Sequence, residues 1–229
     1  MAIFKTSDRY VKPAAVVSST IFACLAALYF IPADIPFKIA FPLAFLTLAS
    51  LWMCPWKISL ALLFSTLGDL AGNCGNLILQ MGSFAVTHIM LIWFLAERYR
   101  TKVERDGKLT EKARGYTYVI CFSCAVLAGL AFTAIVRNTP AGMIRIGTGV
   151  YTLMISAMLA LALLQRSSLY ALGAVLFVFS DFILGWEIFR EPIENSIWLI
   201  MVPYYLGQWL IYIRSTSFRV APEMRLMRF

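Results

Sequence analysis

Long apolar runs, separated by short polar breaks, follow one another along almost the whole chain. A bilayer core of about 30 Å is crossed by about 20 helical residues of mainly apolar character. Pro, Gly and Asn clusters lie between the runs and mark turns. The pattern therefore predicts an all-α membrane helix bundle with eight transmembrane helices, near residues 14–31, 35–53, 56–72, 76–96, 116–136, 142–164, 168–186 and 196–213. One longer polar segment, Glu97–Gly115, is predicted to be a solvated, charged loop.

The composition supports a membrane protein rather than a soluble one. The 229 residues are 61% hydrophobic and 14% charged, whereas soluble domains are about 45–50% apolar and about 25% charged. The first apolar run, from Ala14 to Ile31, is longer than the core of a signal peptide, which has about 7–15 residues. We therefore expect it to be retained as the first span of a single transmembrane domain covering residues 1–229.

The positive charges predict an orientation. With both termini cytoplasmic, eight spans place 16 of the 20 Lys and Arg residues on the cytoplasmic side, as the positive-inside rule requires. Because the basic residues lie between apolar runs and not on a soluble face, the net charge of +8 does not indicate a nucleic-acid partner. We expect an integral, multi-pass protein of the cell membrane if the source is bacterial, or of the endoplasmic reticulum if it is eukaryotic. The sequence leaves the oligomeric state open.

Two aspartates lie inside apolar runs, Asp69 late in the third predicted span and Asp181 late in the seventh. A carboxylate in this environment costs about 2.5–3.5 kcal/mol on insertion scales, and such residues usually face the bundle interior and have a function. Both spans run outward in the predicted topology, so both aspartates are expected at a similar depth. One could then carry a proton while the other stays ionised. The alternative, which the sequence leaves open, is that each is paired with Lys38, Arg145 or a backbone group.

Other polar residues are predicted at a comparable depth. Lys38 and Arg145 lie near the outer starts of the second and sixth spans, and Tyr151 follows Arg145 on the sixth. His88, the only histidine, lies in the middle of the fourth span, where a lone histidine is more often a core residue than a ligand. There is neither an HExxH nor a GxSxG motif, so neither a zinc site nor a serine triad is supported.

Four short motifs occur in order along these spans. They are Ser65-Thr66-Leu67-Gly68-Asp69, Phe84-Ala85-Val86-Thr87-His88, Gly173-Ala174-Val175-Leu176-Phe177-Val178-Phe179-Ser180-Asp181 and Tyr204-Tyr205-Leu206-Gly207-Gln208. Together they resemble the signatures of the lysoplasmalogenase family of multi-spanning membrane proteins (YhhN-like). The chain departs from that family at Ala71-Gly72-Asn73, where bulky apolar residues are usual, and in its long charged segment.

The resemblance implies hydrolysis of the vinyl ether bond of a lysoplasmalogen, a lysophospholipid substrate taken from the membrane, to a fatty aldehyde and a glycerophospho-ethanolamine or -choline. Asp69 and Asp181 would be the catalytic pair, one as acid and the other as stabiliser or base, as in glycosidases; the sequence does not decide which is which. The remaining residues would bind or orient the substrate, with the two basic ones at the phosphate: Lys38, His88, Arg145, Tyr151, Ser180, Tyr204, Tyr205 and Gln208. No metal or organic cofactor is implied.

Two other functions fit the same residues. Intramembrane carboxylates also mark proton and ion pathways, so a proton-coupled or lipid transporter is one alternative. A non-catalytic lipid-binding membrane protein with the same fold is the other. Formation of fatty aldehyde from a lysoplasmalogen would distinguish the enzyme from both.

Overall fold

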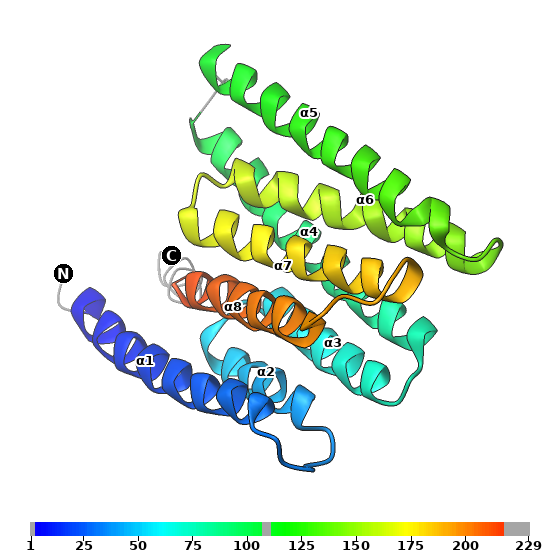
Figure 1. Ribbon diagram of the computed structural model, residues 1–229. Coiled ribbons are helices and arrows are strands. Elements are labelled where there is room, and N and C mark those ends of the chain that lie inside the picture. Colours follow the sequence, from blue (N-terminus) through cyan, green and yellow to red (C-terminus); the bar gives the residue numbers. More distant parts are fainter. Residues whose placement is uncertain (1–2, 107–110, 218–229) are drawn as a thin grey trace. The chain divides into compact units, whose positions relative to one another are not determined.

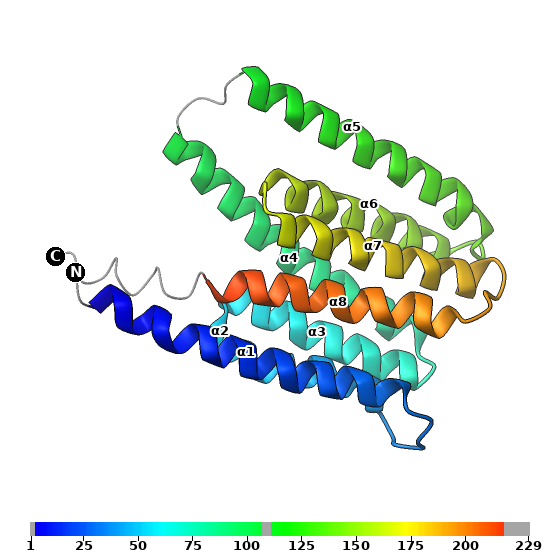
Figure 2. The ribbon, with the colours of Figure 1, turned by 60° about the vertical axis from the view of Figure 1, so that its left-hand side comes forward.

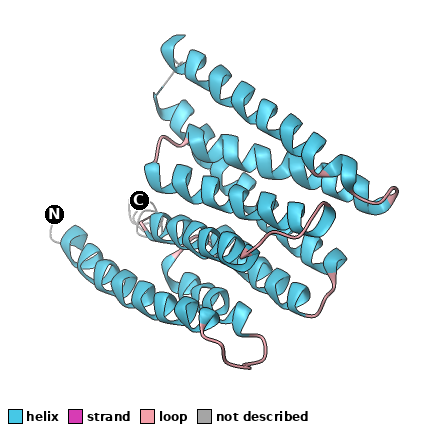
Figure 3. Cartoon of the chain, viewed as in Figure 1, coloured by secondary structure: helices cyan, strands magenta, loops and turns pink. Residues whose placement is uncertain are grey.

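The computed structural model describes residues 3–106 and 111–217, and within these ranges it contains helices and loops but no strand (Figures 1 and 3). The eight α-helices are α1 (Ile3–Phe30), α2 (Phe41–Met53), α3 (Trp56–Asn73), α4 (Leu77–Asp106), α5 (Glu111–Ala134), α6 (Met143–Leu164), α7 (Ser168–Phe189) and α8 (Ser196–Thr216). Two short 3-10 helices, Lys38–Ala40 and Val136–Asn138, precede α2 and follow α5. The all-helical class expected from the apolar runs is confirmed.

Among residues 3–106 and 111–217, six helices are long and apolar enough to cross a membrane, and the protein is accordingly an integral membrane protein. These six segments are Pro13–Phe30, Leu77–Glu104, Arg114–Asn138, Met143–Leu164, Ser168–Phe189 and Ser196–Thr216. Helix α2 has 13 residues and is therefore only about 20 Å long. Helix α3 has 18 residues but carries two charged side chains, Lys57 and Asp69. Eight spans and two cytoplasmic termini stay predictions.

The helix of the second predicted span, near 35–53, begins later than residue 35. The chain enters a 3-10 helix at Lys38, and α2 begins only at Phe41. Phe37, just before the 3-10 helix, has a φ of 57°, a left-handed conformation that bulky residues seldom adopt. A right-handed helix cannot run through this position, so the segment before it is a loop.

The predicted loop Glu97–Gly115 is also largely wrong. Helix α4 continues to Asp106 and α5 begins at Glu111; residues 107–110 lie outside the described part of the chain. Glu, Arg and Lys are good helix formers, and Arg100 donates a hydrogen bond to Glu104 one turn later at 2.7 Å, a spacing that supports an exposed helix. The charges therefore extend the helix beyond its apolar part.

The turn between α3 and α4 lies where the sequence predicts a break. Gly75 adopts a left-handed conformation with a φ of 71°, which glycine accepts without strain. The side-chain oxygen of Asn76 accepts a hydrogen bond from the Leu79 amide at 3.0 Å and so caps the start of α4. The glycine and the asparagine therefore end one helix and begin the next.

Contacts divide the chain into two compact units, Met1–Thr87 with Trp209–Phe229, and His88–Gln208. The boundaries fall within α4 and α8. In the first unit α2 packs against both α1 and α3 (Figure 2). In the second, α6 packs against both α5 and α7 (Figures 1 and 2).

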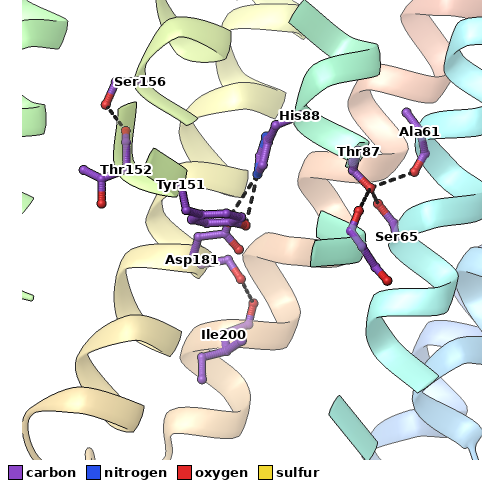
Figure 4. Close-up of polar contacts among 11 residues, drawn as sticks. Ala61, Ser65, Thr87, His88, Tyr151, Thr152, Ser156, Asp181 and Ile200 are labelled. Atoms are coloured by element: carbon purple, nitrogen blue, oxygen red, sulfur yellow. Dashed lines mark hydrogen bonds and ion pairs between the residues drawn. The ribbon is translucent and has the colours of Figure 1, made fainter. Parts of the chain in front are cut away.

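Hydroxyl groups join the helices of the first unit. Thr87 of α4 donates to the carbonyl of Ala61 in α3 at 3.0 Å and lies 3.2 Å from the Ser65 hydroxyl (Figure 4). At the end of α8, Trp209 donates to Ser19 of α1 and Tyr212 donates to Ser18, both at 2.9 Å. Lipid tails give helices little hydrophobic reason to associate, so short polar contacts of this kind contribute to their packing.

In the second unit, α8 approaches α7 most closely at Gly207. A Cβ atom at this position would lie 2.8 Å from the Gly173 carbonyl oxygen and 3.1 Å from the Phe177 amide nitrogen. Both atoms belong to the α7 backbone and cannot rotate away. The crossing of α7 and α8 therefore requires a glycine at this position.

We predict that Gly207→Ala lowers the free energy of unfolding by about 1–3 kcal/mol, the usual cost of overpacking, because α8 must move away from α7. Gly129→Ala in α5 is the matched control, since its added Cβ would have no neighbour within 4 Å. Thermal unfolding of both variants in detergent measures the effect. Equal melting temperatures for the two variants would contradict the close approach.

Candidate functional site

Three polar residues of the second unit, of which His88 is fully buried, meet at one carboxylate oxygen. Tyr151 of α6 donates its hydroxyl hydrogen to Asp181 Oδ2 of α7 at 2.8 Å. His88 Nε2 of α4 lies 3.2 Å from the same oxygen and 3.1 Å from the Tyr151 hydroxyl (Figure 4). Three of the predicted site residues, from three different helices, are therefore brought together.

Burial makes this cluster energetically demanding. The side chain of His88 is 0% exposed and that of Asp181 is 7% exposed. A buried carboxylate is costly unless hydrogen-bond donors surround it. The Tyr151 hydroxyl supplies one, and His88 supplies a second when its Nε2 atom carries the hydrogen. Within the described residues, Asp181 Oδ1 makes no hydrogen bond, so both polar contacts lie on one oxygen.

Aromatic rings enclose one side of the cluster. The Phe177 ring centroid lies 4.8 Å from that of His88 and 5.6 Å from that of Tyr204, whose ring lies 5.5 Å from Tyr205. Phe177 lies in the third motif but was not among the predicted site residues. Its position one helical turn before Asp181 on α7 places both on one face, and this spacing was the available signal.

Ser180 has a structural contact of its own. Its hydroxyl donates to the carbonyl of Ile200 in α8 at 2.9 Å, and the side chain is buried. The bond links α7 to α8 at the residue next to Asp181. Of the other predicted residues on α8, Tyr204, Tyr205 and Gln208 are all buried in the same unit.

Asp69 belongs to the first unit, in α3, and is 3% exposed. The hydroxyl of Tyr29, in α1, is close enough to interact electrostatically with its carboxylate. The Lys38 ammonium lies over the Tyr29 ring, 5.9 Å from its centroid. Tyr29 was missed in the sequence because it is 40 positions before Asp69 and lies outside all four motifs.

The two predicted phosphate-binding cations hold the turns before their own helices. Lys38 Nζ donates to the Ile31 and Ala33 carbonyls, both at 2.9 Å. Arg145 donates to the Thr139 carbonyl from Nε at 3.1 Å and from Nη2 at 2.7 Å. Neither cation forms an ion pair with any carboxylate in residues 3–106 or 111–217. Asp181 is therefore paired with His88 and Tyr151, and not with Arg145.

The motifs also contact each other. A Cβ at Gly68 would lie 3.0 Å from the ring of Phe84, so the glycine of the first motif makes room for the phenylalanine of the second. Gly207 makes the equivalent close approach to Gly173 in the third and fourth motifs. Comparison with protein families places these motifs in a known group: a profile of the YhhN family matches residues 33–215.

The chain belongs to the YhhN family. The YhhN match includes all of α2 to α7 and nearly all of α8, whereas α1 precedes it. Comparisons with curated protein sequences and with solved structures found no match. The resemblance drawn from the four motifs is thereby confirmed at the level of the family.

We predict that Ser180→Ala lowers stability by about 0.6 kcal/mol, and by at most about 1.7 kcal/mol, the range found for hydrogen bonds between membrane helices. The control is Ser156→Ala, because the Ser156 hydroxyl bonds only to Thr152 in its own helix, at 2.8 Å. Unfolding in mixed micelles measures both variants. A Ser180→Ala variant no less stable than Ser156→Ala would show that the contact with α8 does not contribute to stability.

Proposed function

We propose that this YhhN protein is a lysoplasmalogenase, a membrane enzyme that hydrolyses the vinyl ether bond of lysoplasmalogens. Membership of the family supports the proposal at the level of the fold. The observation that carries it is the buried cluster of Asp181, Tyr151 and His88, because buried carboxyls held by specific donors are typical of acid–base sites. Asp69 is proposed as the second catalytic carboxyl.

The chemistry explains why carboxyls are needed. A vinyl ether is hydrolysed when a proton is added to its outer alkene carbon, which leaves a positive charge shared between the inner carbon and the ether oxygen. Water then attacks the inner carbon, and the resulting hemiacetal separates into an aldehyde and an alcohol. An acid must give the proton, and a negative group must stabilise the cation and accept a proton from water. No electrons are transferred to or from the substrate, so the reaction requires no redox cofactor.

The substrate has one long chain and an anionic head group. Lys38 and Arg145 are proposed to attract the phosphate, because each keeps its positive charge while bound to backbone carbonyls. Tyr204, Tyr205 and Gln208 are proposed to orient the glycerol part near Asp181. The membrane in which this occurs is proposed to be the cell membrane in a bacterium or the endoplasmic reticulum in a eukaryote.

A proton-coupled transporter remains the second candidate because of one observation. The contact of His88 with Asp181 at 3.2 Å joins two groups that exchange protons readily, and such pairs occur in proton relays. An enzyme and a transporter differ in their product: only the enzyme releases a fatty aldehyde.

We predict that the purified protein releases fatty aldehyde from a lysoplasmalogen and none from the matching acyl lysophospholipid. Asp69→Asn and Asp181→Asn should each lower kcat at least about 100-fold, since acid–base groups contribute about 10²–10⁴-fold. Aldehyde is measured by mass spectrometry after derivatisation. The control is Asp34→Asn, because Asp34 lies exposed in the loop before α2.

Two outcomes would decide against the enzyme. Aldehyde release that persists in the double variant would exclude a mechanism based on these carboxyls. An inactive wild-type protein that carries protons across liposomes together with a lysophospholipid would favour transport.

A further inference from the structure

Asp181 has two chemically different oxygens, and this difference bears on the role that the proposed function leaves undecided. Both hydrogen-bonding partners, Tyr151 and His88, lie on Oδ2, at 2.8 Å and 3.2 Å. Oδ1 makes no hydrogen bond within the described residues, although the side chain as a whole is 7% exposed. Oδ2 is therefore held in place by two side chains, while Oδ1 is bound by no side chain or backbone group of the described residues.

The two contacts on Oδ2 fit an ionised Asp181. The Tyr151 hydroxyl has a single hydrogen, which it donates to Oδ2. When Asp181 is ionised its oxygens can only accept, so His88 Nε2 then carries the hydrogen of this contact. The Nδ1 atom of the buried ring has no partner within the described residues. In this form the imidazole contacts Asp181 as a donor.

Two donors on one oxygen favour the charged form of a carboxyl. From this arrangement, and resting on the function proposed above, we infer that Asp181 acts as the ionised carboxylate of the reaction. Its Oδ1 stabilises the cation and takes a proton from the attacking water, while Tyr151 and His88 are positioning residues that hold Oδ2. The proton for the alkene carbon then comes from a different acid. We assign this role to Asp69, the second catalytic carboxyl proposed above.

The protons balance in this assignment. The acid gives its proton to the outer alkene carbon, forming a C–H bond as the double bond is lost. Water forms a C–O bond to the inner carbon and loses a proton to Asp181 Oδ1. When the hemiacetal breaks its bond to the glycerol oxygen, that oxygen takes the proton from Oδ1. The hemiacetal hydroxyl becomes the aldehyde oxygen and returns its proton to the first acid, so both carboxyls are restored.

Chemical rescue distinguishes a base from an acid. Asp181→Gly removes the carboxylate and leaves space for formate, which at neutral pH is an ion able to accept a proton from water but a poor proton donor. We expect added formate to raise aldehyde release at least about 10-fold in Asp181→Gly, a fraction of the usual acid–base contribution, and to leave Asp69→Gly unchanged. The assignment would be overturned if formate rescued Asp69→Gly, either alone or as well as Asp181→Gly. It would also be overturned if formate rescued neither variant.

The positioning residues have their own measurement. Tyr151→Phe should lower kcat about 10- to 100-fold with KM changed less than about 2-fold, because the hydroxyl acts on the carboxylate and not on substrate binding. Tyr170→Phe is the control, a buried tyrosine near the start of the same helix as Asp181. His88→Gln keeps an N–H near the position of Nε2 and should retain more kcat than His88→Leu. Equal kcat for the two His88 variants, or a Tyr151→Phe variant that changes KM alone, would contradict the positioning role.

Folding and function are separated by two further measurements. A lysophospholipid with a saturated ether chain cannot be hydrolysed in this way, so its binding shows whether each variant keeps its fold. If Asp181→Gly does not bind this lipid, Asp181→Ala replaces it in the rescue experiment. A wild-type protein that releases no aldehyde would contradict the proposed function, and this inference with it. A wild-type protein that releases aldehyde, with the wrong pattern of rescue, would contradict this inference alone.

Discussion

A carboxylate buried among membrane helices must be surrounded by hydrogen-bond donors, and in the second unit this requirement ties three helices to each other. Asp181 on α7 is reached by Tyr151 from α6 and by His88 from α4. A register shift of either helix by one residue, which moves a side chain about 1.5 Å along the axis and about 100° around it, would carry its polar group away from Oδ2. The close packing of α8 at Gly207 and the Ser180 hydroxyl bond keep the neighbouring helix in place beside this cluster.

Each sequence motif combines a packing residue with a candidate chemical residue. In the first motif Ser65 contacts Thr87 of α4, and Gly68 makes room for the Phe84 ring, so both serve helix packing beside Asp69. In the third, Gly173 lies against α8 and Ser180 bonds to it, again beside the aspartate. Small residues allow helices in lipid to approach closely. The position of each carboxyl is thereby set by its neighbours in the sequence.

Local sequence patterns predict well which residues form helices, but they predict poorly which side chains of different helices come into contact. Apolar runs locate every helix, and Pro, Gly and Asn locate the turns, since these signals depend on neighbouring residues alone. Charge does not separate a loop from an exposed helix, which is why the helical end of α4 beyond Glu97 was expected to be a loop. Asp181, His88 and Tyr151 could each be named from the sequence, but their meeting at one oxygen depends on packing. Tyr29 carries no local signal at all.

The partner of a buried carboxylate decides what that carboxylate can do. An aspartate bound to arginine has its charge neutralised by a permanent cation and becomes a weak base. Here Arg145 is bound to the Thr139 carbonyl, and Asp181 is held by a hydroxyl and an imidazole instead. These donors stabilise the carboxylate without occupying its second oxygen, so it remains available to water or to a developing cation. Lys38 and Arg145, in turn, are bound by backbone carbonyls and not by Asp181. This separation of charges argues for a chemical role at Asp181 over a purely structural one.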